Sequence, residues 1–590
     1  MTCSDPNTSQ PLALGIDAGG TYTDAVLVTC AEARVVAQAK ALTTPQDLSI
    51  GIANALDMLS LPNRQVIRSV SLATTLATNA IVEKRGGRVA LLLIGYDRRM
   101  LAQFNLLGNL PVVERLSLKG RLDEQGQELE PLDETEVRLI LEGMRGRVEA
   151  LAVSGYFSVN NPRHEQQVKE LASDMLAVPV VCGHELTSRL DAVKRAVTAA
   201  LNARLLPIID TLLDALDACL RERGITAPLL MMGGEGKLLT AAEVRLRPVE
   251  TILSGPAASV VAARLANVSD GIVIDMGGTT SDIAVLRKGS PGLSPDGALV
   301  GGWPTSVNAV DVRTCGLGGD SHIQLLSGRL KIGPRRACPV CLAATEHVEI
   351  LPHLRRLDAL SRNSGRTFPV SLTDFVVQVR PATGLQLNWQ ERAVLDQVKQ
   401  GPVPLVDILE RMDGTHLHVQ GIAQLEERGL VQQIGLTPTD LLHAQGKYAV
   451  WDADAAVLAT GILARQFGVD AGELCRRVEE QIVDQLAFEI IARLLKDQDI
   501  QDGASGWDAY LLRRALDGQD PAAPLHCRIG LHDPLIGLGA PAGAYLPRLA
   551  EKLNTTYVCP PYAEVGVALG TVLGQLADFS IECQYSAIID

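Results

Sequence analysis

A short glycine motif occurs twice in the chain and restricts the possible folds more strongly than any other feature. The first copy is Asp17-Ala18-Gly19-Gly20-Thr21-Tyr22-Thr23-Asp24, and the second is Asp275-Met276-Gly277-Gly278-Thr279-Thr280-Ser281-Asp282. Apolar runs precede and follow both copies, so each copy predicts a strand, a tight turn and a second strand. Two matching copies indicate two related halves, each of which carries one half of a site.

The residue types of the motif predict a phosphate site. Paired glycines let backbone N–H groups form a concave cradle for an anion, and Thr and Ser hydroxyls add donors. An aspartate at the end of each first strand repels that anion unless a hard cation such as Mg²⁺ lies between them. A P-loop requires a following Gly-Lys-Ser/Thr, and a dinucleotide fingerprint requires a following helix, so the motif fits neither. One such hairpin alone is usually an ordinary turn, whereas two matching copies favour phosphate binding.

Length and charge limit the domain count and the partners. At ~150 residues per domain, a chain of 590 residues predicts three or four domains. The chain has 54 Lys and Arg against 68 Asp and Glu, a net charge of −14, which disfavours nucleic acid and anionic membranes. Residues 1–10 do not read as a secretory signal, and no apolar run approaches the ~18 residues of a membrane span. We therefore expect a cytoplasmic protein with no nucleic-acid partner and no membrane partner.

The chain contains 11 cysteines, and without an export signal they predict reduced thiols rather than a disulfide framework. Only Cys338 and Cys341 are clustered. Zinc would require two further ligands, for which Cys315, His347 and His353 are available, although no second pair has the matching spacing. Two interpretations stay open for the pair: a metal site, or two buried thiols near the end of a strand.

Strands and helices alternate after the first motif, which is the signature of an α/β fold. The patterns predict a helix over 49–59, a polar hairpin over 119–132, and two helices, 190–206 and 208–223, separated by a break at Pro207. Strands are predicted over 66–72, 89–94, 150–154, 178–181 and 229–232. A serine turn within 251–259 then opens an Ala-rich helix just before the second motif.

Residues with hydroxyl and amide side chains follow the predicted strand 66–72. Thr75, Thr78 and Asn79 lie at the start of a predicted helix, whose N–H groups and dipole favour an anion or a carbonyl oxygen. Simple helix capping explains the same residues, and the spacing alone favours that explanation. These residues are therefore candidates for a substrate site only in combination with other features.

Two more glycine loops occur later in the chain. One loop, 311–322, contains Gly318 and Gly319, and the other, 537–543, precedes a predicted helix over 545–553. Each loop alone is a weak signal. The backbone of the second loop could lie against a flat adenine ring or close a sugar pocket.

Residues 391–433 follow a different pattern, which resembles a winged-helix insert. Three short amphipathic segments, 392–398, 404–412 and 417–426, lead into a polar strand. Acidic residues outnumber basic residues in this region, whereas a protein that reads DNA needs cationic contacts to phosphates. We interpret the region as a packing or partner module.

With these motifs, the chain resembles the hydantoinase/oxoprolinase family of ATP-dependent subunits, which are related to hydantoin hydrolases, 5-oxoprolinase and the acetone carboxylase large chain. The resemblance rests on the two glycine motifs, on 73–80, on Leu253-Ser254-Gly255-Pro256-Ala257, and on the closing region over 549–570. The chain departs from the family pattern at Gly319-Asp320-Ser321-His322, around Cys338 and in the insert.

That family is similar in fold to sugar kinases, actin and heat-shock chaperones. The resemblance therefore implies an α/β fold with duplicated ribonuclease-H-like ATPase domains, ATP in the cleft and a small winged-helix-like insert. It implies an N-terminal ATPase half over 1–185 and a second half with the second motif over 186–385. The insert then covers 386–436, and 437–590 completes the second half with the adenosine-side loop.

The resemblance also implies roles for single residues. Asp17 and Asp275 would be catalytic residues that position hydrated Mg²⁺, and Gly539 and Ala540 would face the adenosine. The remaining residues implied to bind ATP are Gly19, Gly20, Thr21, Thr23, Gly277, Gly278, Thr279, Thr280, Gly318 and Gly319.

On the substrate side, the resemblance suggests Thr75, Thr78 and Asn79, with Asn79 also a catalytic candidate. Asp320 and His322 are further catalytic candidates. They form either an added metal or acid/base pair or a structural hydrogen-bonded pair, and the sequence leaves both possibilities open.

The implied activity is ATP- and Mg²⁺-dependent hydrolysis of a cyclic amide or imide of the hydantoin or 5-oxoproline type. ATP would phosphorylate the amide oxygen, so that water can open the ring. A small-molecule kinase, an ATP-dependent carboxylase subunit, and an ATP-gated activator or interaction protein stay open as different functions on the same scaffold. The expected partners are a cyclic amide or carbonyl substrate and a second hydantoinase-type subunit, and we expect an oligomer.

Overall fold

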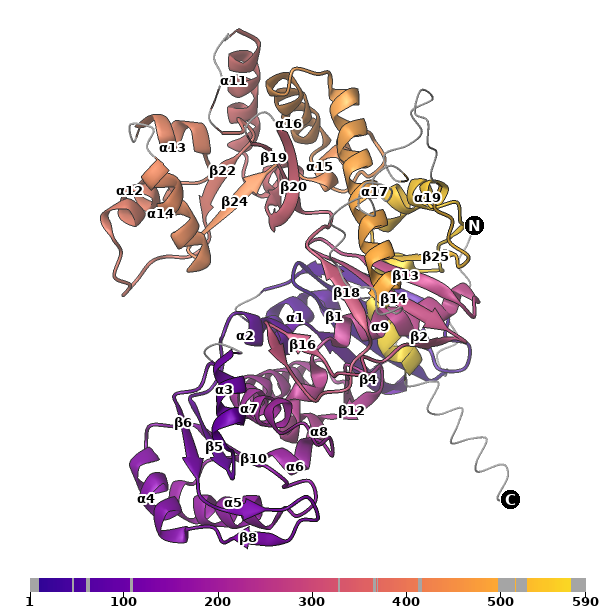
Figure 1. The fold of residues 1–590 in the computed structure, drawn as a ribbon. Coiled ribbons are helices and arrows are strands. Elements are labelled where there is room, and N and C mark those ends of the chain that lie inside the picture. Colours follow the sequence, from indigo (N-terminus) through magenta and orange to yellow (C-terminus); the bar gives the residue numbers. More distant parts are fainter. Residues whose placement is uncertain are drawn as a thin grey trace. The chain divides into compact units, whose positions relative to one another are not determined.

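The computed structural model combines helices with sheets throughout, which confirms the predicted mixed α/β class (Figure 1). It describes residues 10–44, 47–59, 64–106, 110–326, 329–363, 368, 370–411, 416–496, 515 and 528–574. The chain divides into two compact units. The first unit comprises 1–270, 284–312 and 561–590, and the second comprises 271–283 and 313–560. Most of the predicted polar start and residue 412 of the segment 404–412 lie outside the described residues.

The first unit contains a sheet of six strands in the order β12-β11-β4-β1-β2-β3. Its strands are β1 (Leu12–Ala18), β2 (Tyr22–Thr29), β3 (Val35–Leu42), β4 (Ile67–Thr74), β11 (Leu229–Met232) and β12 (Leu238–Thr240). Strand β1 pairs antiparallel with β2 and parallel with β4, and β4 pairs parallel with β11. Because β1, β4 and β11 run in the same direction, their carboxyl ends meet at one edge of the sheet. Ligands bind at such edges in α/β folds.

A second sheet of the first unit has the order β10-β9-β5-β6, and all its pairs are parallel. The strands are β5 (Val89–Ile94), β6 (Glu114–Leu118), β9 (Ala150–Gly155) and β10 (Val180–Cys182). Every residue of β5 and β9 is buried, which explains the unbroken apolar sequence of β5 and the apolar first four residues of β9. The helices of this part are α3 (Arg98–Leu106), α4 (Glu134–Met144), α5 (Arg163–Leu176) and α6 (Gly183–Leu186). The predicted polar hairpin forms β7 (Arg121–Leu122) and β8 (Glu128–Glu130).

The predicted break at Pro207 is wrong, because one helix, α7 (Ala192–Glu222), continues through that residue. A proline inside a helix removes one hydrogen bond of the ladder and its ring crowds the preceding turn. Here the loop at Gly87 packs against this point. Its N–H donates to the carbonyl of Arg204 over 3.0 Å, and a Cβ at Gly87 would lie 3.1 Å from the Pro207 ring. Backbone from outside the helix thus satisfies a carbonyl near the proline.

Among the described residues, α7 alone is long and apolar enough to cross a membrane. In this structure, 72% of its most apolar 18-residue window is buried inside the protein. Its apolar length is therefore accounted for by core packing, against the strands β5 and β9 among others.

The second unit contains most of a sheet in the order β15-β14-β13-β25-β26, with β18 paired to β14. The strands are β13 (Gly271–Met276), β14 (Ser281–Arg287), β15 (Ser290–Pro291), β18 (Val312–Cys315), β25 (Leu535–Leu538) and β26 (Tyr557–Val558). The chain passes from one unit to the other within β14. The helices that share the core of the second unit are α10 (Val340–Glu346), α11 (Ile350–Asn363), α15 (Pro438–Ala444), α16 (Ala453–Gln466), α17 (Ala471–Lys496) and α19 (Ala542–Lys552).

The predicted insert contains three helices, one for each predicted amphipathic segment. They are α12 (Trp389–Val398), α13 (Leu405–Arg411) and α14 (His416–Glu427). A small sheet in the order β21-β24-β22-β23 accompanies them, formed by β21 (Cys338–Pro339), β22 (Phe375–Gln378), β23 (Val403–Pro404) and β24 (Val431–Gly435). The apolar faces of the helices meet in one cluster. The winged-helix assignment itself stays a prediction.

The compact units are divided differently from the predicted ranges 1–185, 186–385, 386–436 and 437–590. Residues 186–270 and the C-terminal helix Ala563–Gly574 both belong to the first unit. The hydroxyl of Thr571 donates to the carbonyl of Ser71 in β4, and a Cβ at Gly15 would lie 2.2 Å from the carbonyl oxygen of Ala568. This close packing ties the C-terminal helix to the first sheet.

Candidate functional site

Both glycine turns close in the same way, and both form the predicted strand, turn and strand. In the first, the N–H of Gly19 donates to the carbonyl of Tyr22 over 3.0 Å. In the second, the N–H of Gly277 donates to the carbonyl of Thr280 over 2.9 Å. Asp17 and the matching Asp275 each lie one residue before the end of their strand, β1 or β13. The sequence repeat is therefore also a repeat of structure.

The open side of each turn fits an anion. Gly20 is exposed, and a Cβ placed there would meet no atom within 4 Å. Thr21, Gly278 and Thr279 are partly exposed. Since Gly19 and Gly277 use their N–H groups to close the turns, these following residues would supply the donors to a phosphate. Hard carboxylate oxygens at the adjoining strand ends are the ligand type that Mg²⁺ prefers.

A second glycine loop packs directly on the second turn. The N–H of Gly319 donates to the carbonyl of Gly277 over 3.0 Å, and the N–H of Asp320 donates to that of Gly278 over 2.6 Å. A Cβ at Gly318 would lie 2.5 Å from the carbonyl oxygen of Gly278, so only glycine fits this approach. The structure therefore brings Gly318 and Gly319 to the second turn.

The third glycine loop lies beside the second turn, because strand β13 pairs with β25. This parallel pairing puts Leu538 beside Asp275, and Gly539 follows with a φ of +84°. A Cβ at Gly539 would lie 2.2 Å from the carbonyl oxygen of Met276 and 3.1 Å from the carboxylate of Asp275. Ala540, the next residue, is exposed. The predicted adenosine-side loop thus lies next to the predicted metal ligand of the second unit.

In the first unit, the predicted substrate residues lie near the end of β1. The N–H of Thr75 donates to the carbonyl of Ala18 over 3.3 Å. The side-chain amide of Asn79 donates to the hydroxyl of Thr75, and the hydroxyl of Thr78 accepts from the N–H of Leu253, each over 3.2 Å. Thr75 makes no side-chain capping bond to the following helix, α2 (Leu76–Val82), so helix capping does not explain that residue.

Ser254 is a structural residue of this region to which the sequence assigned no role. Its hydroxyl donates to the carbonyl of Thr74 over 2.9 Å and accepts from the N–H of Thr74 over 3.2 Å. Leu253, just before it, adopts a left-handed conformation with a φ of +58°. These bonds attach the start of helix α9 (Ser254–Ala262) to the end of β4. Only the local Ser-Gly-Pro motif could have indicated this contact.

Thr23 does not lie on the open side of the first turn. Its side chain is fully buried, and its hydroxyl is 3.0 Å from the hydroxyl of Thr43. At the matching position, the buried Ser281 donates to the carbonyl of Leu317 over 2.6 Å. Both hydroxyls therefore hold their hairpins to neighbouring backbone or side chains. Thr280, by contrast, stays partly exposed.

The final aspartates of the two motifs have different surroundings. Asp24 lies 2.9 Å from the ammonium of Lys40; burial raises the pKa of Asp24, and Lys40 opposes that shift. Asp282 instead accepts a hydrogen bond of 2.5 Å from the hydroxyl of Thr314. Burial, with a smaller contribution from the nearby Asp275, raises the pKa of Asp282 to about 7.

Asp320 and His322 each lie beside a partner from elsewhere in the second unit. Asp320 lies 3.4 Å from the guanidinium of Arg336, and Nε2 of His322 lies 2.9 Å from a carboxylate oxygen of Asp374. Both His322 and Asp374 are almost fully buried. A Cβ at Gly435 would lie 2.5 Å from Nε2 of His322, so this glycine makes room for the ring. The catalytic roles of Asp320 and His322 stay predictions.

Cys338 and Cys341 are buried thiols. Burial raises the pKa of both, that of Cys338 to about 12, so both stay protonated at neutral pH. Sγ of Cys341 lies 3.7 Å from Nδ1 of His443. Across the described part of the chain, one group of three side chains brings ligand atoms within 4.8 Å of one another, and that group is Glu165, Cys182 and His184.

Two family models match the chain, and each match contains one of the two glycine turns. Hydantoinase/oxoprolinase N-terminal region matches residues 13–176, and Hydantoinase/oxoprolinase matches residues 195–344. The chain is 32% identical over 367 residues to caprolactamase subunit alpha of Pseudomonas jessenii, covering 57% of this chain and 52% of that relative. The chain spans about half the length of the curated relatives it matches.

Two solved structures share the fold. Nucleotide-free acetone carboxylase, from a study of ATP-dependent acetone carboxylation, matches with a TM-score of 0.61 and 17% identity. The ATP-dependent caprolactamase of Pseudomonas jessenii matches with a TM-score of 0.59 and 24% identity. Both matches cover 95% of this chain and 70% of the other, and at these identities they establish the fold alone. The two family models together match more than half of the chain, and they show that the chain belongs to the hydantoinase/oxoprolinase family.

Proposed function

We propose that the chain is the ATP-binding part of an ATP- and Mg²⁺-dependent hydrolase that opens a cyclic amide or imide. The observation that carries this proposal is the equivalent closure of the two glycine turns, each with an aspartate one residue before the strand end. Such a pair supplies anion donors twice and a hard carboxylate twice, which suits a magnesium-bound triphosphate. A duplicated ribonuclease-H-like architecture would account for the repeat.

In this proposal, different residues of the chain bind the metal, the phosphates and the adenosine. Asp17 and Asp275 hold the hydrated Mg²⁺, which when bound neutralises part of the phosphate charge. Gly19, Gly20 and Thr21, together with Gly277, Gly278, Thr279 and Thr280 and the loop Gly318–Gly319, surround the phosphates. Gly539 and Ala540 lie against the adenosine.

Thr75, Thr78 and Asn79 orient the amide so that its carbonyl oxygen takes the γ-phosphoryl group and ADP leaves. Phosphorylation makes the adjoining carbon more electrophilic, so water adds there and the ring C–N bond breaks, with the nitrogen leaving as a protonated amine. A second water then hydrolyses the remaining acyl phosphate to the carboxylate and free phosphate. Asp320 has a positioning role, because its N–H fixes Gly278 of the second turn. His322 belongs to the packing behind that loop, bonded to Asp374.

The name of the caprolactamase relative, a subunit alpha, supports a second subunit as partner. The insert formed by α12, α13 and α14 would be the surface that such a partner uses, and an oligomer would follow from this association. Acidic residues prevail on the insert, so we do not propose a nucleic-acid partner.

The experiment is a substrate screen with the purified chain, with and without a second hydantoinase-type subunit. ADP release is measured with hydantoins, 5-oxoproline and lactams, and the opened product is identified by mass spectrometry. We expect ADP release coupled to ring opening for at least one compound. Absence of ADP release with every compound, in both conditions, would contradict the proposal.

An ATP-dependent carboxylase is the second candidate, because a relative from Aromatoleum aromaticum that is 31% identical over 384 residues is named acetophenone carboxylase gamma subunit. It predicts ADP release that depends on bicarbonate and a ketone, with a carboxylated product. A stable phosphorylated product would instead indicate a small-molecule kinase. ATP hydrolysis that responds only to a partner protein would indicate an activator.

A further inference from the structure

A polar cavity of about 390 Å³ lies in the first unit, at the carboxyl end of β11. Gly233, the residue that follows β11, lines it, as does Glu250, whose carbonyl accepts from the N–H of Gly234 over 2.8 Å. Strand β11 is parallel to β4, whose carboxyl end leads into Thr75. The cavity therefore lies on the edge of the sheet where α/β folds bind ligands.

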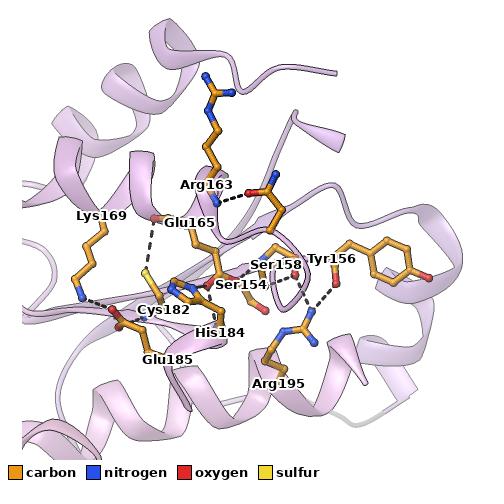
Figure 2. A network of polar contacts seen from close by, with 12 residues as sticks. Ser154, Tyr156, Ser158, Arg163, Glu165, Lys169, Cys182, His184, Glu185 and Arg195 are labelled. Atoms are coloured by element: carbon orange, nitrogen blue, oxygen red, sulfur yellow. Dashed lines mark hydrogen bonds and ion pairs between the residues drawn. The ribbon is translucent and has the colours of Figure 1, made fainter. Parts of the chain in front are cut away.

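A buried network holds one wall of this cavity, formed by residues 184–189 (Figure 2). Figure 2 shows Glu165 beside His184. The carboxylate of Glu165 accepts hydrogen bonds from the N–H of Gly155 over 2.6 Å and from the N–H of His184 over 3.0 Å. It also lies 2.5 Å from Nδ1 of His184. The guanidinium of the fully buried Arg195 donates to the carbonyls of Gly155 and Arg189. This network fixes the backbone at both ends of the wall, so the cavity is preorganised.

One cation of the cavity is left without a carboxylate. Lys237 pairs with Glu235 over 3.0 Å, and Arg247 lies 3.5 Å from Glu250. The guanidinium of Arg189 instead donates to two neutral oxygens, the carbonyl of Pro295 and the side-chain oxygen of Asn308. In the described ranges, no ion pair includes Arg189. A guanidinium has five N–H donors, so two bonds leave donors for a ligand.

A buried hydroxyl in the same cavity also has no partner. Ser306 lines the cavity, is 5% exposed, and its Oγ makes no hydrogen bond within the described part of the chain. Its N–H donates to the hydroxyl of Thr198 over 2.8 Å, which fixes the backbone at this position. An unsatisfied buried hydroxyl is unfavourable, and a bound acceptor would satisfy it.

We propose that this cavity binds a small molecule through a carboxylate, with Arg189 as the counter-ion and the hydroxyl of Ser306 as a second donor. A carboxylate matches the geometry of a guanidinium and supplies one negative charge, which would balance the positive charge of Arg189. The carboxylates of Glu185, Glu235 and Glu250, which line the same cavity, disfavour a second negative charge next to Arg189, such as that of a phosphate dianion. The shared chemistry is therefore a carboxylate monoanion or a small dicarboxylate with one end buried.

Such a ligand has two sources. It is either the substrate or ring-opened product of the proposed reaction, in which case the inference rests on the proposed function, or a regulatory carboxylate that is not consumed. Binding itself requires neither nucleotide nor turnover. Failure of the carboxylate site and failure of the proposed function are therefore distinguishable.

The test compares glutarate with glutaramide, its uncharged analogue, by calorimetric titration of the full chain without nucleotide. We expect glutarate to bind at least about tenfold more tightly, because a charge-assisted hydrogen bond contributes about 1.5–3 kcal/mol. Arg189→Gln should remove this preference. The matched control is Arg247→Gln, a cation of the same cavity that already faces Glu250, and it should change glutarate binding less than about threefold.

The variant Ser306→Ala tests whether the hydroxyl contributes to ligand binding rather than to the stability of the fold. Because the hydroxyl is unpartnered in the free protein, its removal should leave the melting temperature unchanged or raised while weakening glutarate binding by about threefold to tenfold. Equal binding of glutaramide and glutarate, no binding of either, or wild-type binding by Arg189→Gln would each overturn the inference.

Turnover then distinguishes the two sources. If the carboxylate is part of the substrate, Arg189→Gln should raise KM for 5-oxoproline and leave KM for the neutral 2-pyrrolidinone unchanged. If it is regulatory, glutarate should change the turnover of a neutral lactam without being consumed, and Arg189→Gln should abolish that effect.

Discussion

The two glycine hairpins share their turn and their strand-end aspartate but differ in what surrounds them. In the first hairpin, Gly20 stands in open space, and the final aspartate, Asp24, faces a lysine. In the second, loops carrying Gly318 and Gly539 press against the turn, and the final aspartate, Asp282, has a hydroxyl as its partner. What is common to both copies fits the phosphate and metal binding that we propose for them. The surroundings of the two turns and of the final aspartates differ because each hairpin packs against different segments.

The largest effect is expected from the strand-end aspartates, where the two halves are alike. Asp17→Asn and Asp275→Asn should each lower ATP turnover by at least about 10²-fold, because each removes a carboxylate that holds the cation on the triphosphate. The measurement is ADP release at saturating ATP and Mg²⁺. Asp133→Asn, at the cap of helix α4, is the control and should keep wild-type turnover. A loss in only one of the two variants would show that the halves are not equivalent.

The next largest effect concerns the packing around the two turns, which differs between the hairpins. Gly318→Ala should destabilise the protein by about 1–3 kcal/mol, because a Cβ there would lie 2.5 Å from the carbonyl oxygen of Gly278. Gly20→Ala should change the stability by less than about 1 kcal/mol, since a Cβ there meets no atom within 4 Å. Urea unfolding of both variants measures the difference. Equal stability losses would mean that the second turn is no more enclosed than the first.

A pH-dependent effect is expected at Asp282. Its folded-state pKa is raised to about 7 from an ordinary value of 3.8, so the folded state binds this proton more tightly than the unfolded state. Stability from this group is therefore present at low pH and is lost as the pH rises from about 4 through 7. In buffer without Mg²⁺ or nucleotide, Asp282→Asn should match the wild type near pH 4 and exceed it in stability by a few kilocalories per mole at pH 8. A gap that shrinks as the pH rises would refute the assignment.

The residue pattern predicted the local parts of these hairpins, whereas the contacts that come from distant segments were implied only by the family resemblance. The strand-turn-strand pattern follows from alternating runs and paired glycines, all within one short stretch. The convergence of Gly539 on Asp275 depends on the pairing of β13 with β25, whose residues lie far apart in the chain. No local pattern specifies that pairing. The cavity at the carboxyl end of β11 was not predicted for the same reason, since its lining comes from residues 184–189, 233–250 and 306–308.

One wrong prediction and one incomplete prediction both involve contacts from outside the local sequence. Pro207 was predicted to break a helix, but the helix continues through it, and the loop at Gly87 packs there and donates its N–H to the carbonyl of Arg204. The sequence named Asp320 and His322 as candidates but did not indicate their neighbours Arg336 and Asp374, which lie further along the chain.

The smallest effect is expected at Thr23, where it tests whether the hydroxyl binds phosphate or only stabilises the hairpin. The sequence suggested a cofactor-binding role, whereas the structure buries this side chain against Thr43. Thr23→Val, which keeps the shape, should lower the free energy of unfolding by about 1 kcal/mol and leave KM for ATP unchanged. Ser281→Ala in the second hairpin should do the same, since its hydroxyl is bonded to the carbonyl of Leu317. A rise in KM for ATP without loss of stability in Thr23→Val would instead place that hydroxyl on the nucleotide, and the two hairpins would then differ at this position too.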